Sequence, residues 1–253
     1  MKVTTRINYE TEAPNGTILH LPFYSDHFDE AEITPVEGGG WRLTALVLDF
    51  DPEPHNPREF TDGNMLWLGF EHRRYKIGDE TFDPTCPHCG GQAYWVNGEG
   101  DDEDCPHCGG AGEAMTLAKA IEFTRHRYDA VAVWQVGMID HSGLSFYLGG
   151  GAHWCDPGGW DSGTCGLLVL SRERLREWGH EVPEGEPTPD QLATYTEWAR
   201  GEISEYDAWS TGDMYGIVDW VFDADGEATD DTTCWGYIGY EYALSELEAM
   251  RQR

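Results

Sequence analysis

The sequence predicts an α+β fold, with a mixed or antiparallel sheet, flanking helices and an inserted small zinc ribbon. Three observations lead to this prediction. Short apolar runs are separated by glycine, proline and Asp-Gly turns, which is typical of strands and hairpins. Other stretches carry helix caps and apolar residues at helical spacing. Two copies of a Cys-Pro-His-Cys-Gly-Gly motif lie in one short acidic segment.

The predicted strands are short apolar runs with turn residues at their ends. The first follows three consecutive glycines and precedes segment 51–57, whose three prolines exclude helix and inner strand alike. The turn at 140–143 and the Asp225-Gly226 pair each join two strands as a hairpin. The predicted strands span residues 41–50, 131–136, 144–148, 165–170, 214–222 and 232–240.

The predicted helices begin and end at recognisable caps. The third has the clearest start, because Thr188 caps it, Pro189 suits its first turn and Gln191 completes a capping box. Gly179 is expected to end the second helix. Three acidic side chains of the third helix are expected to face water: Glu197, Glu202 and Glu205. The helices span residues 114–128, 172–178, 188–209 and 241–253.

These elements are interpreted as one α+β domain in two parts. Residues 1–83 form the first part, residues 84–113 form the cysteine-rich insert, and residues 114–253 form the remainder with an acidic C-terminal third. With 40% hydrophobic and 13% aromatic residues, the chain can bury a core despite its charge. It has no window of 18 apolar residues and no apolar run at its start. The sequence therefore indicates a cytoplasmic protein without a membrane span.

Acidic residues dominate the composition. The chain has 47 Asp and Glu against 16 Lys and Arg, so its net charge is −31. This charge disfavours direct nucleic-acid binding, because phosphate contacts need basic side chains. Three origins remain open: halophilic adaptation, mimicry of DNA phosphates, and a GC-rich genome that replaces lysine with arginine. Adaptation to salt agrees with the scarcity of lysine, which occurs only at Lys2, Lys76 and Lys119.

The charge is unevenly distributed along the chain. Residues 181–253 hold 18 acids and three bases, which is about half of the acidic excess. Uniform adaptation to salt would spread the acids more evenly. The count therefore favours a specific acidic face in the C-terminal third.

The cysteine-rich insert carries the most specific motif. Its pattern, C-x2-C-x15-C-x2-C with glycine after each pair, predicts a structural zinc site with four thiolate ligands and no open position. The expected Zn²⁺ ligands are Cys86, Cys89, Cys105 and Cys108. His88 and His107 are alternative ligands, for which four thiolates leave no vacancy. The knuckles resemble those of zinc ribbons and DnaJ-type chaperones. Because the insert has no basic residue, we expect a scaffold or protein contact.

A second group holds the residue types of a nucleophilic site. His141, Asp161 and Ser162, with Arg73, would suit a small hydrolase or nucleotide-processing enzyme if they met in a cleft. Their motifs, Asp-His-Ser-Gly and Trp-Asp-Ser-Gly, are also typical of tight turns. The turn interpretation is favoured, and the chain is not expected to be an enzyme.

Two weaker patterns also have structural alternatives. Cys155, Cys165 and Cys234 with His153 are a candidate second metal site, although buried free thiols are favoured. Residues 223–227 resemble part of a calcium loop but lack its spaced glutamate, so a hairpin turn is favoured.

Several motifs occur in a fixed order along the chain. They are Asn-Pro-Arg-Glu-Phe at 56–60, Gly-Asn-Met at 63–65, His-Arg-Arg-Tyr at 72–75, Asp-His-Ser-Gly at 140–143, Trp-Asp-Ser-Gly at 160–163, Gly-Glu-Ile-Ser-Glu-Tyr-Asp at 201–207, Thr-Gly-Asp-Met-Tyr-Gly at 211–216 and Cys-Trp-Gly-Tyr at 234–237. Together they resemble an uncharacterised family of small tailed-phage proteins. Phe60 and Cys165 depart from the family pattern, and the insert is not a family feature. The resemblance implies a viral accessory gene.

The leading hypothesis combines the charge with this resemblance. It is a viral accessory protein in the infected host cytoplasm that binds and modulates a host or viral protein through an acidic surface. The expected partner is a basic nucleic-acid-binding host enzyme of defence, inhibited by DNA mimicry. The alternatives are the hydrolase with His141, Asp161 and Ser162, and a virion structural component.

Overall fold

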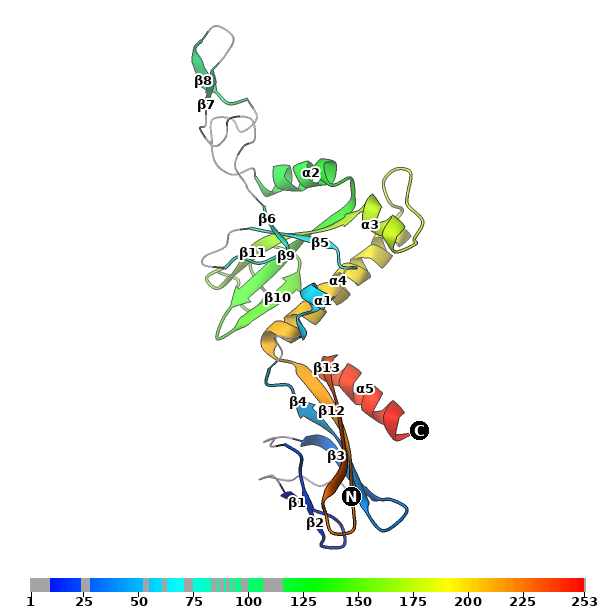
Figure 1. The fold of residues 1–253 in the computed structure, drawn as a ribbon. Coiled ribbons are helices and arrows are strands. Elements are labelled where there is room, and N and C mark those ends of the chain that lie inside the picture. The colour runs from blue at the N-terminus through cyan, green and yellow to red at the C-terminus, as the bar shows by residue number, and fades with distance from the viewer. Residues whose placement is uncertain are drawn as a thin grey trace. The chain divides into compact units, whose positions relative to one another are not determined.

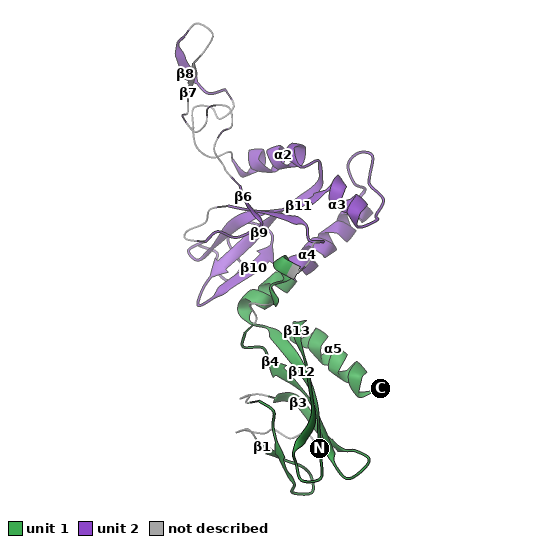
Figure 2. Ribbon diagram, viewed as in Figure 1, with its two compact units in different colours: residues 1–60, 205–253 green, residues 61–204 purple. Residues whose placement is uncertain are grey.

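The computed structural model of the chain divides into two compact units (Figure 2). Unit 1 comprises residues 1–60 and 205–253, and unit 2 comprises residues 61–204. Each unit packs helices on a sheet, which confirms the predicted α+β class. The structure describes residues 10–23, 28–51, 55–60, 63–70, 75–82, 86, 89, 92, 94–96, 100–106 and 116–252.

Unit 1 is built on a four-stranded antiparallel sheet with the order β13-β12-β4-β3 (Figure 1). The β1–β2 hairpin packs on one face, where Leu19 joins a core with Trp220 and Phe222. On the other face, Leu247 of α5 packs with Leu46. The elements are β1 (Glu10–Glu12), β2 (Ile18–His20), β3 (Phe28–Pro35), β4 (Trp41–Leu48), α1 (Pro57–Phe60), β12 (Met214–Phe222), β13 (Ala228–Ile238) and α5 (Tyr240–Arg251).

Unit 2 is built on a five-stranded mixed sheet with the order β10-β9-β11-β5-β6, in which only the β5–β6 pair is parallel. Helix α2 covers one face, with Ala120 against Leu167. On the other face Trp134 Nε1 donates a hydrogen bond of 3.2 Å to Thr196 of α4. The elements are β5 (Leu66–Gly69), β6 (Glu80–Thr81), β7 (Tyr94–Val96), β8 (Asp102–Asp104), α2 (Leu117–Arg127), β9 (Ala130–Asp140), β10 (Leu144–Leu148), β11 (Ser162–Ser171), α3 (Arg172–Glu177) and α4 (Pro189–Thr211), of which the part up to residue 204 belongs to this unit.

The predicted hairpins and caps are present. The β9–β10 and β12–β13 hairpins lie where the turn residues indicated, and Gly226 adopts φ of +90° in the second turn. Thr188 and Gln191 exchange both hydrogen bonds of a capping box, at 2.9 and 3.3 Å. Gly179, with φ of +74°, follows α3.

Two local predictions are wrong. Segment 51–57 was expected to be a loop throughout, but the short helix α1 begins at Pro57. Proline is tolerated at the first helical position because a backbone N–H there would make no hydrogen bond within the helix. Glu202 was expected to face water, but its carboxylate is part-buried and accepts a 3.1 Å hydrogen bond from the backbone N–H of Met65.

Candidate functional site

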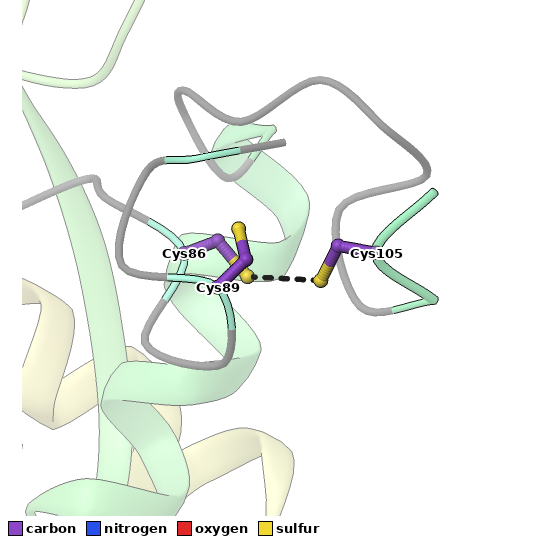
Figure 3. Close-up of side chains that lie close together, drawn as sticks. All are labelled: Cys86, Cys89 and Cys105. Carbon is purple, nitrogen blue, oxygen red and sulfur yellow. Dashed lines mark hydrogen bonds between the residues drawn. The ribbon is translucent and has the colours of Figure 1, made fainter. Parts of the chain in front are cut away.

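Three cysteines of the insert lie together in the structure (Figure 3). Cys86, Cys89 and Cys105 are 2%, 8% and 0% exposed, and their sulfur atoms all lie within 4.8 Å of one another. The sulfurs of Cys86 and Cys105 are 3.8 Å apart. A disulfide would need about 2.05 Å, so these are separate thiols.

The sulfur spacing fits a tetrahedral metal. With metal–sulfur bonds of about 2.3 Å, two thiolates at tetrahedral corners are about 3.8 Å apart, which is the distance between Cys86 and Cys105. The three thiols are therefore close enough to bind one metal ion. The predicted fourth ligand, Cys108, and the alternative ligands His88 and His107 lie outside the described residues.

A short hairpin brings the two halves of the motif together. Strands β7 and β8 pair antiparallel, with Tyr94 opposite Asp104, so that Cys105 follows directly after the paired segment. On the other side, the N–H of Gln92 donates to the carbonyl of Cys89 at 3.1 Å, which closes a turn after the first cysteine pair. The pairing of β7 with β8 thus accounts for the approach of cysteines that are far apart in sequence.

The structure brings two of the predicted catalytic residues together. Nδ1 of His141 lies 3.2 Å from Oδ2 of Asp161, and the two side chains are 76% and 42% exposed. This pair forms because Asp140 N donates to the carbonyl of Asp161 at 2.8 Å, where the β9–β10 turn meets the start of β11. Arg73 lies outside the described residues.

Ser162 is engaged elsewhere. Its side chain is buried, its hydroxyl donates to Asp156 Oδ2 at 2.8 Å, and its oxygen accepts from the backbone N–H of His153 at 2.8 Å. A serine nucleophile needs a base within hydrogen-bond reach and an accessible oxygen. These bonds instead support the turn interpretation of the Trp-Asp-Ser-Gly motif.

Asp156 organises the loop that precedes β11. Its carboxylate accepts backbone hydrogen bonds from Trp160, Asp161 and Ser162 at 2.9–3.2 Å, besides the Ser162 hydroxyl. These bonds, led by that from Asp161 N–H, hold the pKa of Asp156 below its ordinary value. Sequence reasoning missed this residue, although the Asp-Pro-Gly-Gly stretch at 156–159 is itself a turn signal.

The three remaining cysteines do not form the second predicted metal site. Within the described part of the chain, the Cys86 group is the only cluster of three or more ligand side chains at metal-binding spacing. Cys165 is buried as expected, its burial raises its pKa to about 12, and its thiol donates to the Val136 carbonyl at 3.5 Å. Cys155 and Cys234 are exposed, so the expectation of buried thiols is wrong for both.

Cys155 has a basic neighbour that its sequence spacing did not reveal. Its sulfur lies 2.9 Å from Nδ1 of His153, within an exposed part of the loop. The His153 backbone is fixed by Ser162, and its ring contacts the Tyr147 ring at a centroid distance of 4.9 Å. The thiol and the imidazole nitrogen are thus within hydrogen-bond distance of each other.

Residues 223–227 form a hairpin turn rather than a cation loop. Oδ1 of Asp223 accepts hydrogen bonds from the backbone N–H groups of Asp225 and Glu227, both at 3.0 Å. Gly226 has no room for a side chain, because an added Cβ would lie 1.8 Å from the Ile18 carbonyl oxygen. The Asp223 carboxylate therefore caps the turn.

Comparison of the chain with protein-family models, curated proteins and solved structures finds no match. None of the helices that the structure describes is long and apolar enough to cross a membrane.

Proposed function

We propose that this protein is a non-enzymatic viral accessory protein that binds a basic nucleic-acid-directed host enzyme through an acidic surface of unit 1. We call this surface the β13 acidic edge. It consists of five exposed carboxylates on the β12–β13 turn and the first half of β13: Asp223, Asp225, Glu227, Asp230 and Asp231. The exposure of these charges on one hairpin is the observation that carries the proposal.

The carboxylates of this edge differ in how firmly they are held. Asp223 caps the turn, and Asp230 accepts two hydrogen bonds from Thr232. The carboxylates of Asp225 and Asp231 accept no hydrogen bond and form no ion pair within the described part of the chain, which leaves both available to a partner. Exposed charges of one sign steer a basic partner and raise its association rate.

The neighbouring hairpin strengthens the negative field. Glu10 and Glu227 lie 3.4 and 3.7 Å from the two ring nitrogens of His20. The backbone N–H of His20 also donates to the Gly226 carbonyl at 2.9 Å, which joins the β1–β2 hairpin to the acidic turn. Farther along β13, Trp235 is 40% exposed and offers an apolar contact beside the charges.

The metal of the insert is proposed to be Zn²⁺ with a structural role, bound by Cys86, Cys89, Cys105 and Cys108. The support is the spacing of the motif, the burial of the three described thiols and the 3.8 Å sulfur separation. A four-thiolate site has no open position, and so it would stabilise the insert without catalysis.

Inhibition assays on host enzymes test the binding function. Purified protein is added to a panel of restriction, CRISPR and repair enzymes of the host, with DNA cleavage or repair as the readout. We expect inhibition of a basic enzyme. The inhibition should weaken with added salt, and it should weaken with added competitor DNA because DNA and the acidic edge would bind the same site on the enzyme. Failure to inhibit any enzyme of the panel at physiological salt would overturn the proposal.

A matched pair of variants locates the surface. The double variant Asp225→Asn/Asp231→Asn removes two charges from the β13 acidic edge, and Glu241→Gln/Glu248→Gln removes two exposed charges from α5 of the same unit. Only the first is expected to weaken inhibition, by about three- to tenfold. Equal loss in both would indicate a general charge effect. Mass spectrometry of purified virus particles provides the test of the virion alternative.

A further inference from the structure

Two arginines of unit 2 stand out against the composition of the chain. Acids outnumber bases by 47 to 16, so a shortage of carboxylates does not explain an unpaired arginine. Six described arginines do pair with carboxylates: Arg42, Arg125, Arg172, Arg174, Arg200 and Arg251. Arg127 and Arg176 form no ion pair with any residue that the structure describes.

Both unpaired arginines line one cavity. It has a volume of about 690 Å³ and lies between the end of α2 and helix α3. Leu66 of β5 and Val169 of β11, which are paired across the two strands, form an apolar part of its lining. Tyr128 lines the cavity too, and the Arg127 guanidinium lies 6.0 Å from the centre of its ring. The cavity thus combines an apolar part, an aromatic ring and two arginines that form no ion pair with the residues the structure describes.

The other charged groups of the lining are mostly engaged. Asp129 pairs with Arg172 and Arg174 pairs with Glu177, both at 2.8 Å. Glu80 accepts a 3.1 Å hydrogen bond from the neutral Tyr128 hydroxyl, which does not offset its negative charge. Glu173 is exposed and forms no ion pair in the described residues. Among the described residues, the charges of the lining therefore balance, with Arg127, Arg174 and Arg176 against three carboxylates. The lining is much less acidic than the chain as a whole, in which acids outnumber bases by 47 to 16.

We propose that this cavity binds a small organic phosphate with a planar apolar group, of the nucleoside monophosphate class. The Arg127 and Arg176 guanidinium groups would bind the phosphate, since arginine presents a planar fork of donors that matches phosphate oxygens. The planar group would lie on the half-buried Leu66 side chain beside the Tyr128 ring. The volume falls within the range of about 300–1,000 Å³ that is usual for small-molecule sites.

Each part of the ligand is needed for the fit. Inorganic phosphate would satisfy the arginines but leave the apolar lining exposed to water. A nucleoside without phosphate would leave both guanidinium groups unpaired. A triphosphate carries more negative charge than the local pair of arginines can neutralise within an acidic chain. The first two comparisons define the control probes, inorganic phosphate and a nucleoside.

Isothermal titration calorimetry with AMP, adenosine and inorganic phosphate tests the site. At 0.15 M salt the Debye length is about 8 Å, so distant carboxylates are screened. We expect AMP to bind the wild-type protein at least about tenfold more tightly than adenosine or phosphate does. No binding of AMP at millimolar concentration, or equal binding of AMP and adenosine, would overturn the proposal.

Variants assign the binding to the arginines. Arg127→Gln/Arg176→Gln is expected to weaken AMP binding by about tenfold or more, whereas Lys76→Gln/Arg200→Gln, which removes two charges elsewhere in unit 2, should leave it unchanged. Arg176→Lys keeps the charge and loses the fork, so it should bind AMP with intermediate affinity. Unchanged affinity in the first variant, or equal loss in the control, would refute the assignment.

Discussion

Removal of one thiol from the insert tests whether a metal ion holds this segment together. Cys105→Ser is the sharpest change, because Cys105 is fully buried and its sulfur lies 3.8 Å from that of Cys86. In the described part of the insert, the three cysteines are the only buried side chains. The β7–β8 hairpin has three paired positions, and the β8 side chains, Asp102 to Asp104, are exposed acids. A hairpin of this kind is not stable in water by itself.

The size of the effect follows from what a structural metal contributes to a small segment. Structural zinc contributes an apparent 10–16 kcal/mol, about the whole stability of a small domain, in zinc-finger peptides at pH 7. The described part of the insert has no apolar cluster that could replace it. Loss of the metal should therefore unfold the insert, and repulsion among the acids at 101–104 would add to the effect. The sheets of both units should remain folded, since their cores are separate clusters.

Hydrogen exchange with mass spectrometry, combined with metal analysis, provides the measurement. In Cys105→Ser, or after chelation, the amides of β7 and β8 should lose protection while those of β9 and β11 keep theirs. Cys234→Ser is the control, because Cys234 is an exposed thiol of β13 outside the insert. A Cys105→Ser protein that retains one metal per chain and full protection of β7 and β8 would refute the reasoning.

Three further predictions concern unit 2. At pH 8 an alkylating reagent should modify the exposed Cys155 and spare Cys165, because burial raises the pKa of Cys165 to about 12. Peptide mapping identifies the modified cysteine. Asp156→Asn should lower Tm, because the backbone N–H of Asp161 and further donors lower the Asp156 pKa. That stabilisation exists above the unfolded carboxyl pKa of about 3.9 and is lost as pH falls through the lower folded pKa, so the Tm difference should shrink in acid. Thr188→Ala breaks the capping box of α4 and should cost about 1 kcal/mol in urea unfolding.

The elements were predictable from sequence because their signals are local. A proline, an N-cap and a capping-box glutamine mark the start of α4 within four residues, and Asp225-Gly226 marks the β12–β13 turn. The cysteine spacing likewise led to the thiol cluster. Each of these features depends on residues that are near one another in the chain.

The parts that sequence reasoning missed depend on long-range contacts. Strand β12 pairs with β4, which places Ile217 opposite Leu46 and unites both ends of the chain in unit 1. No local pattern encodes that pairing. The cavity lined by Arg127 and Arg176 has the same origin, because the end of α2 and helix α3 come to one cavity through the pairing of β9 with β11. The engagement of Ser162 by Asp156 is an exception, because these residues are only six positions apart and meet through the path of one loop.

The β13 acidic edge has two possible roles that one pair of variants separates. Strand β13 lies at the end of its sheet, and carboxylates on an edge strand hinder pairing with another copy. If that were their only role, Asp225→Asn/Asp231→Asn would associate with itself and still inhibit its target enzyme. Our proposal requires the opposite outcome, in which the variant stays monomeric because Glu227 and Asp230 remain, yet inhibits less.

Light scattering after size exclusion measures the first property, and the enzyme assay measures the second. Glu241→Gln/Glu248→Gln should match the wild-type protein in both, since those charges lie on α5. Oligomers of Asp225→Asn/Asp231→Asn with undiminished inhibition would assign the acids to edge protection. A monomer with weakened, salt-sensitive inhibition would assign them to binding. In that case the assembly of the protein is unchanged, so the loss of inhibition comes from the weaker electrostatic attraction between the acids and the enzyme.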